Sequence, residues 1–241
     1  MPKGTGTENK MARIQILTLV LAGLLTGLNP HQAEGQSVPS PYRFFETRQE
    51  AGLFAGYSGQ GTGRFGYGPE AGPSFGARYG IHLGGAFGLE GVLGYQPTTR
   101  DVVDPTRVEG DMVVGTADAE ILSADVRLRF SLTGDRSWRG LNPFIFMGGG
   151  MAWDAAGEAE DDAKLLDEDR FQFGVRLIAI LGTGIRWFPT KRLLIRTDFG
   201  VTMNQLKTPK GFLDPARALK GVGEKEWVSG PIFSVGAAFH F

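Results

Sequence analysis

The sequence contains no cysteine among its 241 residues. This absence excludes disulfide bonds, thiolate catalysis, zinc sites with cysteine ligands and a lipid anchor on an N-terminal cysteine. Neither sign of charge is in excess, because 25 lysines and arginines stand against 26 aspartates and glutamates. A chain without a basic surplus offers little attraction to a phosphate backbone, so we expect no nucleic-acid partner.

Long apolar runs are missing after Gly35. No stretch there approaches the roughly 18 apolar residues that indicate a membrane-spanning helix. Upstream, Lys10 and Arg13 precede an apolar run at 14–28, and the small residue Ala33 follows it. A basic start, a short apolar middle and small residues at the end are typical of a cleaved secretory signal peptide. The alternative is a retained helical anchor, although the run is shorter than the roughly 20 residues that such a helix needs.

The rest of the chain shows the period-two alternation of β-strands. In the clearest segment Leu122, Val126 and Phe130 share one parity, and Asp125 and Arg129 share the other. Because successive side chains of a strand point to opposite faces, this pattern predicts strands with one apolar face. We recognise eight such segments, the fifth with an ambiguous parity: residues 50–57, 74–83, 86–95, 122–132, 143–153, 181–187, 193–202 and 233–241.

Alternation alone also fits a soluble β-sandwich, but three features favour a barrel that spans a membrane. Several segments reach the length of about 9–11 residues that a spanning strand needs. The connections alternate between long and short, as in barrels with short periplasmic turns and longer outer loops. Aromatic residues lie near strand ends, as in girdles at the two membrane interfaces. The long connections are about 58–72, 96–117, 154–171 and 203–228, and the short ones are near 84–85, 133–142 and 189–192. The aromatic residues near strand ends are Tyr57, Tyr79, Tyr95, Trp153, Trp187, Phe239 and Phe241.

Glycine is abundant, at 37 residues, without the three-residue period of collagen. An eight-stranded barrel leaves an interior barely wide enough for side chains, so small residues must lie opposite large ones. We therefore predict an all-β fold, a transmembrane antiparallel up-and-down β-barrel of eight strands. Ten strands would follow if residues 103–117 or 171–180 formed an extra hairpin arm, but we expect the strands to project above the membrane instead. The glycines on the predicted inner face are Gly76, Gly80, Gly88, Gly94, Gly182, Gly184, Gly200 and Gly236.

The C-terminal segment carries a family resemblance. Phe233, Val235, Phe239 and Phe241 place apolar residues at alternate positions up to the end of the sequence. This run resembles the terminal strand by which bacterial barrels are recognised by their assembly machinery. The segments 142–150 and 184–189 resemble strands of the OmpA-like small outer-membrane β-barrel family.

The resemblance covers about residues 49–241, that is, the barrel portion only, and we expect no peptidoglycan-binding domain. It implies a bacterial outer-membrane location, with the termini in the periplasm and the long loops outside. The barrel-assembly machinery is then an expected partner through the C-terminal strand. The predicted organisation is a signal peptide at 1–35, a short periplasmic N-terminal segment at 36–48 and an outer-membrane β-barrel at 49–241.

Nine charged residues fall on the predicted inner face, five of them arginines. A charge in a narrow lumen is costly unless it is paired and hydrogen-bonded. The pattern therefore predicts a network of paired charges that plugs the lumen. The alternative is a narrow, gated ion path lined by the same groups. The nine residues are Glu50, Arg78, Glu90, Asp125, Arg127, Arg129, Arg186, Arg196 and Asp198.

Histidine placement argues against an enzyme of the outer leaflet. After residue 35 only His82 and His240 remain, and both fall at the predicted periplasmic ends of strands. A general base must be within hydrogen-bond reach of its substrate, which neither position allows on the outer side. We therefore expect no enzyme activity, no catalytic residues, no metal and no cofactor.

The two last long connections differ in charge. Residues 154–170 are strongly acidic, and the final connection is basic. The basic loop is expected to pair with the acidic loop or to contact anionic lipopolysaccharide, although single surface pairs are weak. We thus expect a monomer with a structural or surface-interaction role at the outer-membrane lipid and lipopolysaccharide, with a small or slow-gating porin-like channel as the alternative. The basic residues are Lys207, Lys210, Arg217, Lys220 and Lys225.

Overall fold

In the computed structural model, residues 40–45, 48–157, 159–217 and 219–241 are described, and they form an antiparallel all-β structure. Residues 41–241 make up one unit. The predicted signal peptide at 1–35 and residues 36–39, 46 and 47 of the predicted N-terminal segment lie outside the described residues. Within the described part, no helix is long and apolar enough to cross a membrane.

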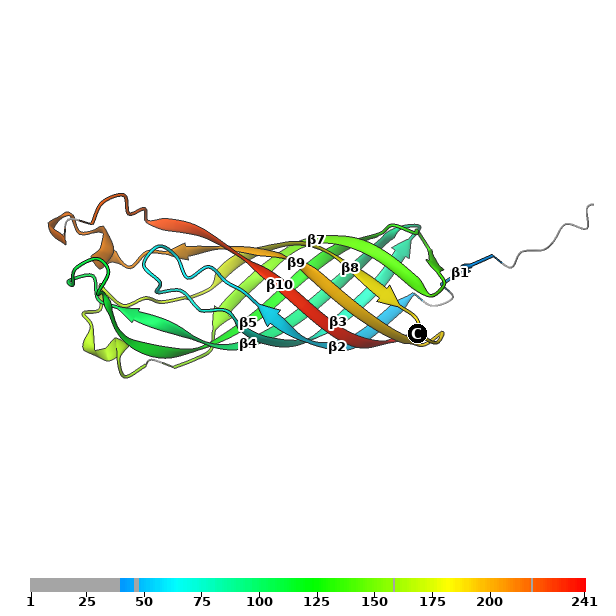
Figure 1. The fold of residues 1–241 in the computed structure, drawn as a ribbon, viewed down its shortest axis with the longest axis horizontal. Coiled ribbons are helices and arrows are strands. Elements are labelled where there is room, and N and C mark those ends of the chain that lie inside the picture. Colours follow the sequence, from blue (N-terminus) through cyan, green and yellow to red (C-terminus); the bar gives the residue numbers. More distant parts are fainter. Residues whose placement is uncertain (1–39, 46–47, 158, 218) are drawn as a thin grey trace, which may run out of the picture. The chain divides into compact units, whose positions relative to one another are not determined.

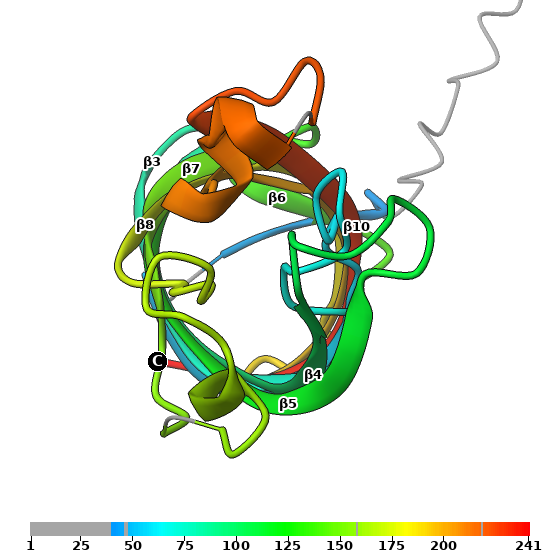
Figure 2. The same cartoon turned by 90° about the vertical axis from the view of Figure 1, so that its left-hand side faces the viewer.

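Eight strands close into a ring. Each pairs antiparallel with its neighbour in the order β2, β3, β4, β5, β7, β8, β9 and β10, and β10 pairs back onto β2 (Figures 1 and 2). The predicted fold class and strand number are therefore confirmed. The strands are β1 (Tyr42–Phe44), β2 (Gln49–Ser58), β3 (Gly72–Gly84), β4 (Phe87–Val103), β5 (Val113–Ser131), β6 (Arg136–Trp138), β7 (Leu141–Asp154), β8 (Arg176–Trp187), β9 (Leu193–Lys207) and β10 (Lys225–His240).

Two ends of the ring differ. At one end, here the short-turn end, tight connections join β3 to β4 and β8 to β9, and β6 lies in the connection from β5 to β7. There the short strand β1 pairs with β6, a pairing that the sequence did not predict. At the opposite end, here the loop end, four long connections gather beyond the strands (Figures 1 and 2). Three short 3₁₀ turns lie in these loops, η1 (Asp162–Lys164), η2 (Lys210–Leu213) and η3 (Pro215–Arg217).

The strands continue into the loop end beyond the eight predicted segments, as expected in place of an extra hairpin arm. Residues 96–117 were expected to be a connection, yet most of them continue β4 and β5, which pair as far as Val103 and Val113. Ala119 and Ile121 are buried there, whereas Asp118 and Glu120 face outward. The apolar parity of β5 therefore reverses beyond Leu122, because this part has a polar exterior and an apolar interior. Residues 103–117 and 171–180 form no extra hairpin arm, since they belong to β4, β5, β8 and their loops.

The parity of the fifth predicted segment, now β7, is fixed by packing. Phe144 and Phe146 point inward and are fully buried, whereas Ile145 and Met147 face outward with 47% and 59% exposure. A side chain on the neighbouring strand at Gly182 would collide with the Phe146 ring. The inner glycines thus give room to aromatic rings inside the barrel, as a narrow lumen requires.

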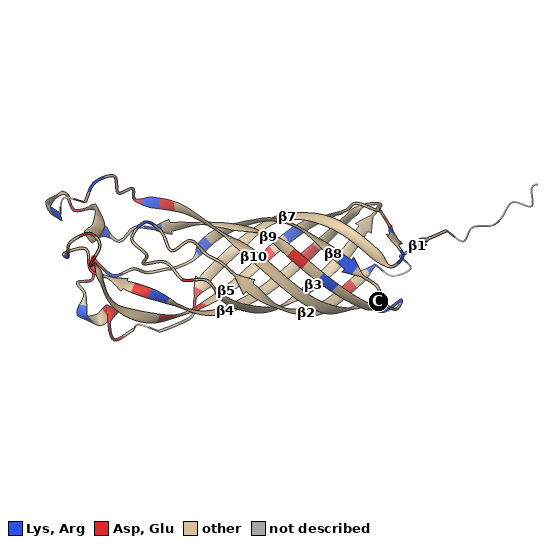
Figure 3. Cartoon of the chain, viewed as in Figure 1, with Lys and Arg blue, Asp and Glu red and all other residues tan. Residues whose placement is uncertain are grey.

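The outer face of the ring is apolar over a continuous belt. Along β9 the outward residues from Leu193 to Met203 include Phe199, which is 60% exposed. Ten residue steps at about 3.4 Å, with a tilt of about 40°, make a belt about 25 Å high. This height matches the apolar band of a membrane barrel. Charged residues lie along the barrel wall and in the loops (Figure 3), and those of the wall within the apolar belt are buried.

Candidate functional site in the barrel lumen

All nine charged residues of the predicted inner face lie in the lumen. Each is at most 8% exposed, so none has full access to water. Five arginines and four carboxylates give this set a net charge of +1. Seven of the nine form one connected chain of ion pairs, and two form a separate pair.

The chain of ion pairs begins near the middle of the lumen with Arg78 of β3. Its Nη1 donates to Asp198 Oδ2 at 2.6 Å, and the other oxygen, Oδ1, accepts from Arg196 Nε at 2.7 Å. Arg196 Nη1 in turn donates to Glu90 Oε1 at 2.6 Å. Four charges from three strands are thereby linked without a gap.

The chain continues toward the short-turn end through Arg129 of β5. Arg129 Nη1 donates to Glu90, and it also donates to Glu50 Oε1 at 2.6 Å. The second oxygen of Glu50 accepts from Arg186 of β8. Arg186 Nη1 reaches Asn142 of β7 at 3.4 Å.

The hydrogen bonds of this chain extend to all eight strands of the ring. Arg78 Nη2 donates to Ser234 Oγ of β10 at 3.3 Å, and Asn142 represents β7. These buried hydrogen bonds therefore link all eight strands of the ring to one another. The separate pair is Asp125 with Arg127, which donates through Nε at 2.5 Å and Nη2 at 3.1 Å.

Aromatic rings lie against most of these guanidinium groups, at distances typical of cation–π contacts. Phe54 has the same parity as Glu50 and therefore falls on the predicted inner face, but no role was predicted for any of the rings. Two features of the sequence could have indicated that Phe54 packs inside the barrel, namely its inner parity and the glycines opposite it. A side chain at one of these, Gly76, would collide with the Phe54 ring. The distances from guanidinium carbon to ring centroid are 4.4 Å for Arg196 and Phe144, 4.7 Å for Arg78 and Phe54, 4.9 Å for Arg186 and Phe188, and 5.4 Å for Arg127 and Phe146.

An aromatic cluster lies at the short-turn mouth of the lumen. Phe45, which follows β1, packs on Phe188 with ring centroids 4.9 Å apart. Both rings contact His240, at 6.0 Å and 5.6 Å, and Phe45 also approaches His82 at 6.2 Å. The two histidines therefore lie at the short-turn end, within an aromatic cluster that includes the Arg186 stack.

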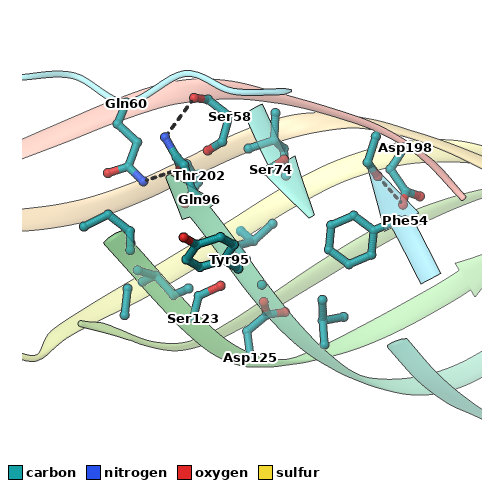
Figure 4. A pocket seen from close by; sticks show the side chains of 18 of the residues that line it. Phe54, Ser58, Gln60, Ser74, Tyr95, Gln96, Ser123, Asp125, Asp198 and Thr202 are labelled. Carbon is teal, nitrogen blue, oxygen red and sulfur yellow. Dashed lines mark hydrogen bonds between the residues drawn. The ribbon is translucent and has the colours of Figure 1, made fainter. Parts of the chain in front are cut away.

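On the loop-end side of the charged residues the lumen contains a chamber of about 100 Å³ (Figure 4). Its rim toward the loop end is a chain of amides, in which Asn204 donates to Gln60 at 3.3 Å and Gln60 to Gln96 at 3.2 Å. Gln96 is anchored by the backbone oxygens of Ser58 and Glu70, at 3.3 Å and 3.1 Å. The floor includes Arg78, Asp125, Arg127 and Asp198, and the walls carry the hydroxyl groups of Ser74, Ser123 and Thr202.

The loop end of the lumen contains an apolar cluster. The rings of Tyr67 and Phe171 pack at 4.8 Å, and Phe65 packs on Phe212 at 5.0 Å. Burial raises the pKa of Tyr67, whose hydroxyl lies 3.4 Å from Thr208 Oγ1. The cluster also contains Val103, Met112, Ala119, Ile121, Ala152, Phe173, Leu206 and Val228.

Ion pairs tie the loops together around this cluster. Arg217 of the basic last loop pairs with Asp169 of the acidic loop and, at 3.3 Å, with Glu168. The hydrogen bond with Asp169 raises the pKa of Arg217. Arg100 of β4 pairs with Asp162, a residue of η1. The expected contact between the acidic and basic loops is therefore present.

The four residues of the predicted assembly signal lie on the outer face or at its edge. Phe233, Val235 and Phe239 belong to β10 and are 49%, 43% and 50% exposed, and Phe241 is 50% exposed. They line the seam where β10 pairs with β2 and closes the ring. Among the described residues, no group of three or more histidines, aspartates and glutamates is arranged to hold a metal ion.

No protein-family model matches the sequence, and no curated protein is significantly similar to it. Similar solved structures exist at low identity. The outer membrane protein OprG from Pseudomonas aeruginosa is 13% identical, with a TM-score of 0.49 over 81% of this chain and 96% of that one. The N-terminal β-barrel domain of Pseudomonas aeruginosa OprF is 12% identical, with a TM-score of 0.40 over 79% and 97%. Neisserial surface protein A is 13% identical, with a TM-score of 0.39 over 84% and 98%. The fold assignment rests on the strand pairing of this chain itself.

Proposed function

We propose that this chain is a bacterial outer-membrane protein whose barrel spans the membrane with its lumen plugged. The exposed apolar belt of about 25 Å supports the location, because such a surface is stable only against lipid. The short-turn end then faces the periplasm, with the termini of the barrel, and the long loops face outward.

The orientation can be tested directly because the chain contains no cysteine. One variant carries Val108→Cys, at a loop residue that is 81% exposed, and the other carries Arg192→Cys, at an exposed residue of a short turn. A membrane-impermeant maleimide applied to intact cells should label the first variant and not the second. Labelling of Arg192→Cys alone would reverse the proposed orientation, and equal labelling of both would contradict the membrane location.

The chain of ion pairs carries the proposal of a plugged lumen. It crosses the interior from Arg78 to Arg186, and its hydrogen bonds reach every strand of the ring. Opening a path would require buried charges to separate, which is strongly unfavourable in a site away from water. The apolar loop cluster adds a second barrier above the chamber.

A plugged barrel leaves the loops and the lipid-facing surface as the places for function. We propose a monomer with a structural or surface-interaction role, without catalysis and without a cofactor. Exposed Lys220 and Lys225 are available to anionic lipopolysaccharide, since Arg217 is engaged by the acidic loop. The C-terminal strand, with its outward Phe233 and Phe239, is proposed to engage the barrel-assembly machinery.

The alternative function is a small or slow-gating channel, and the polar chamber is the observation that favours it. A swelling assay on liposomes that contain the purified protein separates the two functions. We expect glycine and urea to enter no faster than into protein-free liposomes. Entry that depends on the protein would support the channel instead.

A further inference from the structure

The short strands β1 and β6 extend the sheet beyond the ring at the short-turn end (Figure 1). Trp138 of β6 pairs with Leu141 of β7, a position on the outer side of the ring. Tyr42 of β1 lies opposite Trp138 and therefore shares its face. Phe44 and its partner Arg136 lie on that face as well, because each is two residues further along its strand. The outer side of this extension thus continues the apolar belt with aromatic residues.

The three rings are exposed and carry guanidinium groups. Tyr42, Phe44 and Trp138 are 43%, 67% and 43% exposed. The guanidinium carbon of Arg136 lies 5.0 Å from the ring centroid of Tyr42 and 5.8 Å from that of Phe44. The guanidinium carbon of Arg139 lies 5.3 Å from the Trp138 ring. These are cation–π distances, and exposed rings beside cationic groups are typical of the boundary between hydrocarbon and headgroups. We call these five residues the aromatic–arginine face.

The short-turn end as a whole is basic. It has six exposed basic side chains, whereas Asp135 is the one acidic side chain outside the lumen among the described residues of that end. Adding Glu46, which lies outside the described residues, and the carboxyl group of Phe241 would still leave three positive charges. At the loop end, in contrast, Arg100 and Arg217 are held in ion pairs. The basic residues of the short-turn end are Arg43, Arg48, Arg136, Arg139, Lys191 and Arg192.

A partner of this face must offer negative charge to the arginines and apolar contact to the rings. A soluble polyanion supplies only the first, and an uncharged lipid supplies only the second. Phospholipids with a net negative headgroup supply both. We propose that the aromatic–arginine face binds anionic phospholipid headgroups of the periplasmic leaflet. This inference rests on the proposed location and orientation of the barrel, and it names the lipid class that meets its short-turn end.

The test uses the full chain inserted into phosphatidylcholine vesicles. The substitutions Trp153→Phe, Trp187→Phe and Trp227→Phe leave Trp138 as the single tryptophan. Brominated lipid quenches a tryptophan that it contacts, so brominated phosphatidylglycerol should quench Trp138 more than the same mole fraction of brominated phosphatidylcholine. One arginine near an anionic surface contributes roughly a fivefold preference, so two should give a preference of roughly five- to thirtyfold.

Two double variants locate the effect. Arg136→Gln with Arg139→Gln should bring the preference for phosphatidylglycerol close to one. Lys220→Gln with Lys225→Gln removes two exposed positive charges at the loop end and should leave the preference unchanged. Equal quenching of Trp138 by the two lipids in the single-tryptophan chain would overturn the proposal. A preference that survives the loss of both arginines would overturn it as well.

If the double arginine variant does not fold, the dependence on salt decides. The screening length falls from about 10 Å at 0.1 M salt to about 3 Å at 1 M, so the preference should shrink in 1 M sodium chloride. A preference that salt does not change would overturn the proposal.

Insertion is verified separately by the heat-modifiable band on a detergent gel. A chain that does not insert would contradict the proposed membrane location. An inserted chain without a lipid preference would contradict this inference alone. An inserted chain whose Trp138 is quenched by neither lipid would also overturn it, since the face would then lie in water and suit a soluble partner.

Discussion

Removing Arg196 should destabilise the barrel more than any substitution in the loops. Arg196 is 2% exposed, pairs with Glu90 at 2.6 Å and Asp198 at 2.7 Å, and stacks on Phe144 at 4.4 Å. Truncation of one partner of a buried ion pair costs about 3–5 kcal/mol, and here Glu90 and Asp198 each lose one of two arginine partners, keeping Arg129 and Arg78. The lost stack adds roughly 0.5–2 kcal/mol. We therefore expect Arg196→Ala to lower the free energy of unfolding by about 4 kcal/mol, close to a thousandfold in the equilibrium constant.

The assay is equilibrium unfolding in urea of the protein in lipid vesicles, followed by tryptophan fluorescence. Arg196→Lys retains the charge but cannot reproduce the fork geometry or the stack, so its loss should be smaller than that of alanine. In a double-mutant cycle with Glu90→Gln, the coupling energy should be favourable and lie within about 0.5–3 kcal/mol. A loss below about 1 kcal/mol for Arg196→Ala, or a coupling near zero, would refute the role of the chain in stability.

Two further substitutions test the packing of the lumen and of the loops. Gly182→Ala should prevent formation of the heat-modifiable folded band on a detergent gel, because the added carbon would meet Gly200 and the Phe146 ring at once, whereas Gly91→Ala, with open space around it, should fold normally. Equal folding of the two variants would contradict the tight interior. Arg217→Ala should make the loop at 208–224 sensitive to proteinase K while the barrel stays folded, since Arg217 fixes this loop to Asp169. The exposed Lys210→Ala, in the same loop, is the control, and equal resistance of both variants would show that the ion pair does not hold the loop.

The barrel could be predicted because the outward residues of each strand are apolar over most of its length. Leu122, Val126 and Phe130 alternate with inward residues, and lipid requires this alternation throughout the belt. The alternation reverses beyond the belt, where Ile121 is buried and Glu120 faces outward. The predicted bounds of β4 and β5 were therefore too short, although their projection beyond the belt was expected. The β1 pairing with β6 was also missed, because three-residue strands leave no periodic signal.

The lumen residues could be chosen by parity, but their partners could not. Glu50 and Arg129 are 79 positions apart, and their contact depends on barrel closure and side-chain reach. Periodicity shows whether a residue faces the lumen or the outside. It does not show how high the residue lies along the barrel axis relative to residues of distant strands. Asp125 and Arg127 pair with each other and not with the chain of ion pairs, which leaves that chain with an unbalanced charge. This arrangement appears only in three dimensions.

Single-channel recording in a planar lipid bilayer tests most directly whether the chain of ion pairs plugs the lumen. The protein purified from membranes is inserted and recorded for long periods at both polarities. We expect the protein to insert, verified by recovery of folded protein from the bilayer lipid, without conductance steps. Discrete, repeatable steps from the native chain would contradict it, and would make the arginines and carboxylates of the lumen the lining of a channel.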